Sequence, residues 1–231
     1  MITYVVLLIF AGGLIFVLPY AHDYYVKSKL EPQVELSKAL DKMAEVQSYR
    51  YSLDSGFTVD GRKEVISRVE GEKNGNNTHI RGEMVNTPVD IYYINRTVYN
   101  YDSFAEKWIV IESDTTNFED LMISELHPLS NFRFSNIKNI TKEGFEVIDG
   151  RECLVVMCNP TVESKLLETL WHNFTYKIWI DYKKSLIKKA VLQAENKQTK
   201  DTRLNIEVKF KDFDRNIKII PPDTTVKKKQ S

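Results

Sequence analysis

Cysteine is scarce in this chain, since only Cys153 and Cys158 occur among its 231 residues. Both lie in the apolar run from Glu152 to Cys158, which is typical of a buried strand. Strand positions five residues apart face opposite sides and lie roughly 16 Å apart, beyond the reach of a disulfide. We therefore expect two buried free thiols and no disulfide framework.

The composition also lacks the marks of a disordered or nucleic-acid-binding chain. Glycine and proline are few, at 9 and 7 residues, whereas 42% of the residues are hydrophobic and can build a core. The 32 basic residues balance the 32 acidic residues, so nucleic acid is not an expected partner. The basic run Lys227-Lys228-Lys229 fits a solvated tail or a weak attraction to anionic lipid head groups.

Motifs for catalysis and for metal binding are missing. The four histidines lack the spacing of a zinc site, and the acidic residues between Glu112 and Asp120 do not follow a calcium-loop pattern. We find no Gly-x-Ser-x-Gly elbow, phosphate-binding glycine loop or dinucleotide fingerprint. We therefore expect no metal, no cofactor and no enzyme activity. An envelope enzyme whose site is assembled from distant residues would escape this search and stays open.

The first part of the chain is a long uncharged run. Ile2 to Tyr20 carries no charge and is about long enough to cross a bilayer core as a helix. No basic residue precedes it, and Pro19-Tyr20-Ala21 is a poor cleavage site, so we interpret residues 1–21 as an uncleaved transmembrane anchor. Lys27 and Lys29 alone would place the body in the cytoplasm. The family resemblance described below favours the opposite side.

The body is expected to fold as one α+β domain. Residues 22–47 predict a linker and an amphipathic helix that begins near Pro32, because Leu36, Leu40 and Met43 follow at helical spacing. Residues 48–222 predict a curved antiparallel sheet, and 223–231 a basic tail. Further apolar or alternating runs predict strands over 48–59, 64–72, 78–84, 89–94, 97–101, 107–111, 132–137, 145–148, 152–158, 174–180, 186–194 and 204–210. Helical segments are expected within 112–131 and 162–171.

The order of these segments resembles the LolA/LppX-like lipoprotein-carrier superfamily, including Gram-positive members such as the clostridial germination lipoproteins. The resemblance covers about residues 33–222. The motifs that carry it are Ser48-Tyr49-Arg50-Tyr51, Lys107-Trp108-Ile109-Val110, Gly150-Arg151-Glu152-Cys153-Leu154-Val155-Val156, Ile178-Trp179-Ile180-Asp181, Phe210-Lys211-Asp212-Phe213 and Ile219-Ile220-Pro221-Pro222. None of them is specific alone, and their order along the chain is the informative part.

The resemblance implies a bacterial envelope protein with a half-barrel whose concave apolar face, covered by helices, holds acyl chains or a hydrophobic part of a partner. This chain lacks the lipidated cysteine of the lipoprotein members, so its membrane link would be the N-terminal helix, with the body outside the cytoplasm. We predict a non-enzymatic, single-pass envelope protein that binds a lipid or other hydrophobic ligand. The alternative is an envelope or spore scaffold that docks an enzyme such as a peptidoglycan hydrolase.

The candidate cavity-lining residues share the apolar faces of the predicted helices and strands. They are Leu40, Met43, Tyr49, Tyr51, Leu53, Phe57, Leu166, Leu170, Tyr176, Ile178, Leu204, Ile206 and Val208. An apolar strand face must be covered in any case, and the sequence does not distinguish cover by protein from cover by a ligand.

Overall fold

The computed structural model of this protein describes residues 22–112, 123–132, 134–162, 165–199 and 201–225. The expected membrane span lies outside these ranges. Within them, every helix is too short or too polar to cross a bilayer.

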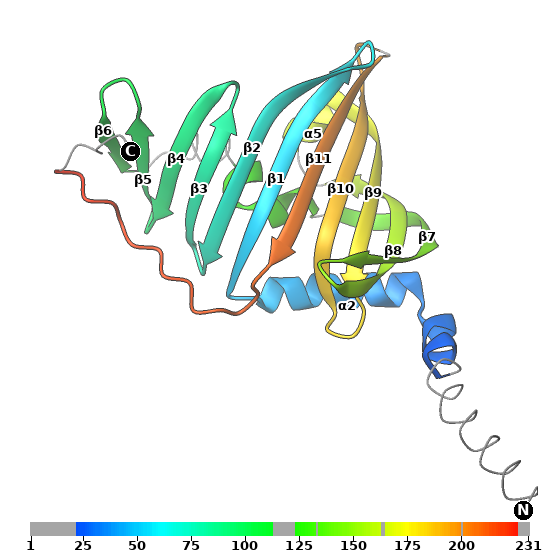
Figure 1. Ribbon diagram of the computed structural model, residues 1–231. Coiled ribbons are helices and arrows are strands. Elements are labelled where there is room, and N and C mark those ends of the chain that lie inside the picture. Colours follow the sequence, from blue (N-terminus) through cyan, green and yellow to red (C-terminus); the bar gives the residue numbers. More distant parts are fainter. Residues whose placement is uncertain (1–21, 113–122, 133, 163–164, 200, 226–231) are drawn as a thin grey trace, which may run out of the picture.

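The described residues form eleven strands in one open antiparallel sheet (Figure 1). The strands are β1 Ser48–Val59, β2 Arg62–Asn74, β3 Asn77–Met84, β4 Thr87–Ile94, β5 Thr97–Asp102, β6 Lys107–Glu112, β7 Phe134–Ile148, β8 Arg151–Val162, β9 Trp171–Asp181, β10 Leu186–Asn196 and β11 Thr202–Lys211. Their order across the sheet is β6-β5-β4-β3-β2-β1-β11-β10-β9-β8-β7. The sheet therefore consists of two meanders of hairpins, joined where β1 pairs with β11.

Tight turns connect several neighbouring strands at the positions that the sequence predicts. Asp60 and Gly61 both have positive φ, at 49° and 78°, and so do Asn95 and Arg96, at 50° and 65°. This backbone matches the right-handed twist of the flanking strands, which is why Asp-Gly and Asn-containing pairs are frequent in two-residue hairpins. These turns set the β1–β2 and β4–β5 pairings.

The second meander departs from the expected strands in three places. Phe134–Ile148 forms one strand of 15 residues instead of two short ones. Its pairing with β8 shifts register three times, and such bulges disrupt the alternation that a sequence pattern needs. β8 continues through Pro160, which falls at one of these irregularities, where its missing N–H costs no ladder bond. Phe132, expected to start a strand, ends a 3-10 helix instead.

Helices pack on one face of the sheet. The helical elements are α2 Pro32–Glu45, α4 Ile123–Leu126, the 3-10 helix η1 Pro128–Phe132, α5 Lys165–Leu170, and a short helix at residues 22–29. α2 packs against β7, β9 and β10, and α4 against β2 and β3. In Figure 1 the strands β7 to β9 curl round toward the side where α4 and α5 lie, which makes this face concave.

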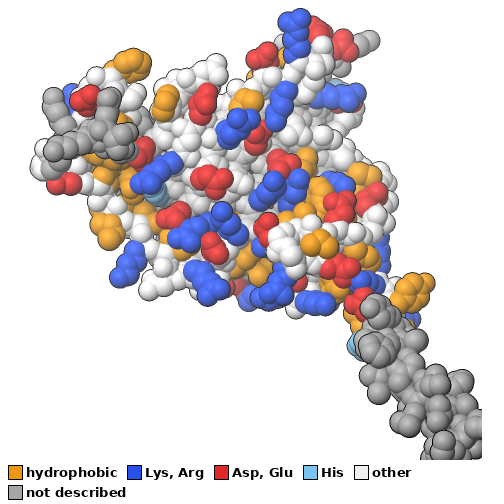
Figure 2. Space-filling model, in the orientation of Figure 1, with side chains coloured by type: hydrophobic (Ala, Val, Ile, Leu, Met, Phe, Trp, Pro, Cys, Tyr) orange, Lys and Arg blue, Asp and Glu red, His pale blue; other side chains and the backbone are white. Residues whose placement is uncertain are grey.

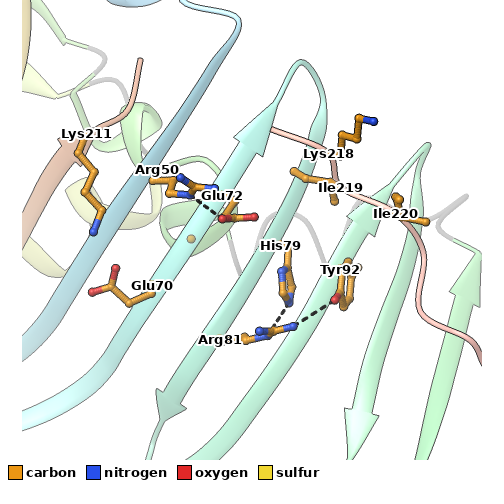
Figure 3. Close-up of a pocket in the computed structure, with 11 residues that line it drawn as sticks. Arg50, Glu70, Glu72, His79, Arg81, Tyr92, Lys211, Lys218, Ile219 and Ile220 are labelled. Carbon is orange, nitrogen blue, oxygen red and sulfur yellow. Dashed lines mark hydrogen bonds and ion pairs between the residues drawn. The ribbon is translucent and has the colours of Figure 1, made fainter. Parts of the chain in front are cut away.

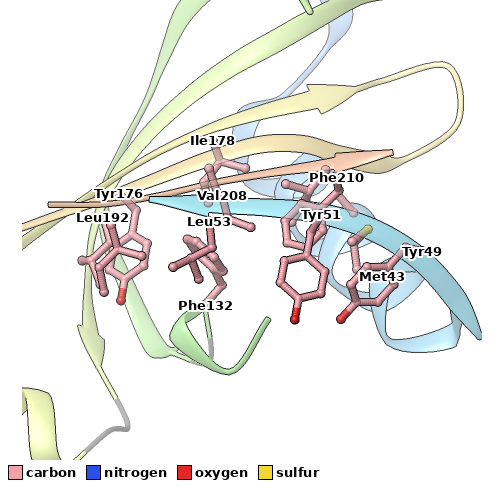
Figure 4. Packing of buried hydrophobic residues seen from close by; sticks show 14 of the residues in the cluster. Met43, Tyr49, Tyr51, Leu53, Phe132, Tyr176, Ile178, Leu192, Val208 and Phe210 are labelled. Atoms are coloured by element: carbon pink, nitrogen blue, oxygen red, sulfur yellow. The ribbon is translucent and has the colours of Figure 1, made fainter. Parts of the chain in front are cut away.

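The main hydrophobic core lies on this concave face. Buried side chains from β1, β9, β10 and β11 point to the same side of the sheet and meet Met43 of α2 and Phe132 of η1 (Figure 4). The other face carries interspersed acidic and basic side chains (Figure 2). Among the described residues, a small hydrophobic cluster of Cys153, Val155 and Trp179 is buried there. Cys158 belongs to the main core, so the two thiols are free, buried and on opposite faces, as predicted.

Candidate binding groove

The middle of the concave face is closed by protein. The Tyr51 hydroxyl donates to the carbonyl of Glu125 in α4, the Ser67 hydroxyl donates to the Glu125 carboxylate at 3.0 Å, and Thr78 donates to the Leu126 carbonyl at 3.2 Å. These bonds fasten α4 across β1, β2 and β3. Gly71 makes the arrangement possible, because a Cβ at this position would lie 2.0 Å from the Tyr51 ring. α4 is therefore in direct contact with these three strands.

An open groove lies instead at one end of this face, between the C-terminal half of α2, the η1 segment and the adjoining ends of β1 and β2. We call it the α2–η1 groove. Its volume is about 710 Å³. Its apolar walls are Leu40, Met43, Ala44, Val46, Tyr49, Leu129 and Phe132. Its polar lining residues are Gln47, Lys73, Gly75, Asn76, His127 and Ser130.

Lys73 gives this groove its electrostatic character. It is the penultimate residue of β2, paired with Tyr49 of β1 and Thr78 of β3, and therefore lies on the concave face. Its ammonium group lies 3.0 Å from Nδ1 of His127. Burial lowers the pKa of Lys73 to about 8, because an ammonium group loses hydration there.

Burial also affects the acidic side chain beneath α4. It raises the pKa of the Glu125 carboxyl, although the bond from Ser67 acts in the opposite direction. The Glu125 side chain is directed to Ser67, whose hydroxyl lies 3.0 Å from that of Ser55. This polar cluster is satisfied within the protein and has the character of a structural fastening for α4.

The thirteen residues predicted as cavity lining fall into four groups. Leu40, Met43 and Tyr49 line the α2–η1 groove. A second group is buried in the closed core and consists of Tyr51, Leu53, Tyr176, Ile178, Leu204, Ile206 and Val208. Phe57 is partly buried and stacks on Trp171 with ring centroids 5.5 Å apart. The roles of these residues in binding a ligand stay predictions.

The fourth group is the predicted cover from α5. Leu170 is 45% exposed and is not among the lining residues of the α2–η1 groove, and its role in binding stays a prediction. The physical reason for this exposure is that α5 has only six residues and runs directly into β9 at Trp171, so it presents no second apolar turn to the sheet. The Leu166 side chain lies outside the described residues.

Sequence reasoning missed the residues that complete the groove. Leu129 and Phe132 come from η1, most of which lies in the segment 112–131 where a short helical piece was expected. Lys73 lies just beyond the strand predicted over 64–72. The inward position of Lys73 was nevertheless readable, because it shares the parity of Val69 and Gly71 along β2.

A second cleft lies on the opposite, charged face, beneath the C-terminal segment (Figure 3). It has a volume of about 450 Å³, and several of its charged groups are paired. Arg50 lies 2.6 Å from Glu72 and 3.2 Å from Asp212, and His79 lies 2.9 Å from Asp90. These pairs link β1 to β2, β1 to the residue after β11, and β3 to β4. The apolar side of the cleft comes from Ile219 and Ile220 of the C-terminal segment.

Metal chemistry finds no support in this part of the chain. Among the described residues, no three side chains of His, Cys, Asp or Glu come together in a way that could hold a metal ion.

Solved structures with a similar architecture include a mycobacterial lipoprotein. The Mycobacterium tuberculosis lipoprotein LppX superposes with a TM-score of 0.57 at 15% identity, over 81% of this chain and 97% of that one. The chain has the LppX-like fold. LprF from Mycobacterium bovis gives a TM-score of 0.57 at 14% identity, over 83% of this chain and 96% of that one.

The LppX-like fold is established by structure and not by sequence. Neither a family model nor a curated protein matches the sequence. A LolA-superfamily protein from Nitrosomonas europaea superposes with a TM-score of 0.34 at 11% identity, over 87% of this chain and 98% of that one. Because the identities are so low, the similarity concerns the fold alone.

Proposed function

We propose that this protein is a non-enzymatic envelope protein that binds a lipid or another hydrophobic molecule in the α2–η1 groove. The observation that carries the proposal is an open groove of about 710 Å³ with apolar walls on the concave face of an LppX-like sheet. Ligand pockets in proteins commonly measure about 300 to 1,000 Å³ and are mostly apolar with a few polar groups. Each methylene group buried there contributes about 0.8 kcal/mol of binding free energy.

The closed middle of the sheet limits what the groove can hold. Tyr176 packs edge-on against Phe132 with ring centroids 5.7 Å apart, and α4 is fastened across β1 to β3. The proposed ligand therefore occupies one end of the half-barrel instead of its full length. A single acyl chain fits this description better than a lipid with several long chains.

Filling the groove tests this function. Native mass spectrometry of the full chain, followed by lipid extraction, should find a bound amphiphile that is lost in Met43→Trp, because the indole would occupy the groove. Val34→Trp is the matched control, since Val34 lies on the same helix and is 42% exposed. Equal ligand content in both variants, or none in the native protein, would contradict the proposal.

The proposed membrane link is the uncharged leader. We propose that residues 1–21 are an anchor, that 22–47 connect it to the sheet domain at 48–222, that 223–231 form a basic tail, and that the body lies outside the cytoplasm. The residues next to the leader are held on the body, since Lys27 lies 2.7 Å from Glu152 of β8. The protein should stay with membranes after a carbonate wash. Amino-terminal sequencing that started near His22 would contradict the anchor.

Labelling with a membrane-impermeant thiol reagent tests the outward placement. A cysteine introduced at Lys227 should react in intact cells, whereas the native protein should give little background. Burial raises the pKa of both Cys153 and Cys158 to about 11, so little thiolate exists at neutral pH. Labelling of the introduced cysteine only after lysis would place the body inside.

A second candidate function, docking of another envelope protein, is favoured by the edge strand β6. Ile109, Val110 and Ile111 are 38%, 46% and 39% exposed, and no described strand pairs with the outer side of β6. An exposed edge can accept an extended segment of a partner. Amide hydrogen exchange tests this: protection along the whole of β6, not only of the amides bonded to β5, would indicate that a strand is bound there.

A further inference from the structure

Lys73 is a basic group inside an otherwise uncharged, largely apolar groove. The apolar lining includes Tyr49, Leu129 and Phe132, and no Asp or Glu belongs to the described lining. Among the described residues, no carboxylate lies within ion-pair distance of its ammonium group, which lies 3.0 Å from Nδ1 of His127. By contrast, Arg50 on the charged face has two carboxylates. A half-buried ammonium group without a counter-ion is costly to the protein alone.

We propose that Lys73 and His127 bind the acidic group of an amphiphile, a carboxylate or phosphate, whose alkyl chain lies between Leu40, Met43 and Phe132. This inference rests on the proposed function and adds the ligand class to it. The bound anion would supply the counter-charge that the groove lacks. The neutral polar residues Gln47 and Asn76 at the same groove offer further hydrogen bonds to such a group.

The charge state of Lys73 predicts how binding depends on pH. Its pKa of about 8 in the empty groove means that it is protonated at lower pH and loses its charge above this value. An anion stabilises the protonated form and raises the pKa, so affinity is full below about 8 and falls as the pH rises further. A neutral ligand of the same length should show no such fall.

Among the described residues, the other titratable groups around Lys73 supply no competing anion. Tyr49 faces it from β1, His127 from the segment after α4, and Tyr93 packs edge-on against His127 at 6.1 Å. The Glu125 carboxylate is bonded to Ser67, six positions from Lys73 on β2 and therefore roughly 20 Å along the strand.

Four probe ligands distinguish the contribution of the alkyl chain to binding from that of the acidic group. Binding of hexadecanoate, hexadecyl phosphate, hexadecanol and acetate to the full-length protein is measured by equilibrium dialysis at pH 7. We expect both acidic amphiphiles to bind more tightly than hexadecanol, and acetate to bind weakly. Lys73→Met should weaken binding of the acidic amphiphiles by about tenfold or more, the scale of one hydrogen bond to a charged group. Hexadecanol binding should change by less than about twofold, since the apolar contacts stay.

Matched variants and distinct outcomes decide the inference. Lys73→Arg should restore most of the loss, and Lys63→Met, an exposed lysine on the same strand, should change nothing. Equal affinity for hexadecanoate and hexadecanol, with no effect of Lys73→Met, would overturn the inference while the proposed function stands. Binding of acetate as tight as that of hexadecanoate would identify a site for small anions and overturn it too. Binding of neither hexadecanoate nor hexadecanol would sink the proposed function and the inference with it.

Discussion

At the scale of single residues, Gly71 and Tyr51 act as a pair. Tyr51 is fully buried, and its ring occupies the space that a side chain at position 71 would need. The hydroxyl of Tyr51 then reaches the carbonyl of Glu125 and fastens α4. The middle of the concave face can therefore close because Gly71 has no side chain. The conformational freedom of the glycine backbone is not what matters here.

Gly71→Ala should lower the free energy of unfolding by about 1 to 3 kcal/mol, because a Cβ 2.0 Å from the Tyr51 ring forces the ring or the strand to move. Urea denaturation measures the change. Tyr51→Leu is the matched background, since the shorter side chain leaves room for the alanine methyl group. There the same substitution should cost less, and an equal cost in both backgrounds would show that the two residues do not compete for space.

Glu125 predicts a pH-dependent contribution to stability. Burial raises the pKa of its carboxyl in the folded protein, so the folded state binds the proton more tightly than the unfolded state does. Above the raised pKa, the ionised Glu125 carboxylate disfavours folding. As the pH falls through the raised pKa, protonation of Glu125 in the folded state removes this penalty and stabilises the folded protein. The native protein should gain stability relative to Glu125→Gln as the pH is lowered from 7. Urea midpoints at several pH values measure this difference, and parallel curves would contradict it.

At the scale of elements, alternation along β1 and β11 assigns one face of the sheet to the core. Val208 is fully buried and paired with Leu53, whereas Thr58 on β1 lies on the other face. Val208→Lys should abolish cooperative unfolding, since burying an unpaired charge costs several kcal/mol of a total that is commonly about 5 to 15. Thr58→Lys should leave the unfolding midpoint nearly unchanged. Circular dichroism melts of both variants test this, and equal tolerance would refute the assignment of faces.

The strands that could be predicted from the sequence are those in which apolar and polar residues alternate regularly. The first meander was predicted because its strands alternate and its turns contain Asp60-Gly61 and Asn95-Arg96. The β7–β8 hairpin was not, because bulges at Lys138 and near Gly144 change which side chains face the core. A bulge adds one residue to a strand and reverses the faces of the residues after it, so a strictly alternating pattern does not predict it.

The groove was only partly readable from sequence, for a different reason. Leu40, Met43 and Tyr49 stand on apolar faces that any periodicity identifies. The choice between closed core and open groove depends on where α4 and η1 lie, and that is set by contacts such as Tyr51 to Glu125, 74 residues apart. Local propensity contains no information about such pairs, so both the closed middle and the position of His127 emerged only from the fold.

At the scale of the whole molecule, the sheet curls without closing, so it has two edges, β6 and β7. β6 is short and exposes three apolar residues in succession, which natural sheets usually avoid with charge, proline or cover. Its sequence begins with Lys107 and ends with Glu112. If two copies pair antiparallel about the point between Ile109 and Val110, each lysine lies opposite the glutamate of the other copy.

This edge predicts concentration-dependent self-association through β6. Sedimentation velocity of the full chain over a wide concentration range should show a dimer, and Val110→Lys should shift the equilibrium toward monomer, because two introduced charges would meet near the centre of the pairing. Val85→Lys is the matched control, since Val85 is a more exposed valine, at 69%, and lies in a turn away from either edge. If both variants reduce association equally, general surface hydrophobicity is the cause and not strand pairing. If the native chain stays monomeric throughout, β6 is free to receive a different partner. Added charge at Val110 should then lower the affinity for that partner. Ligand binding in the α2–η1 groove should not change, because the groove lies on β1 and β2 and not at this edge.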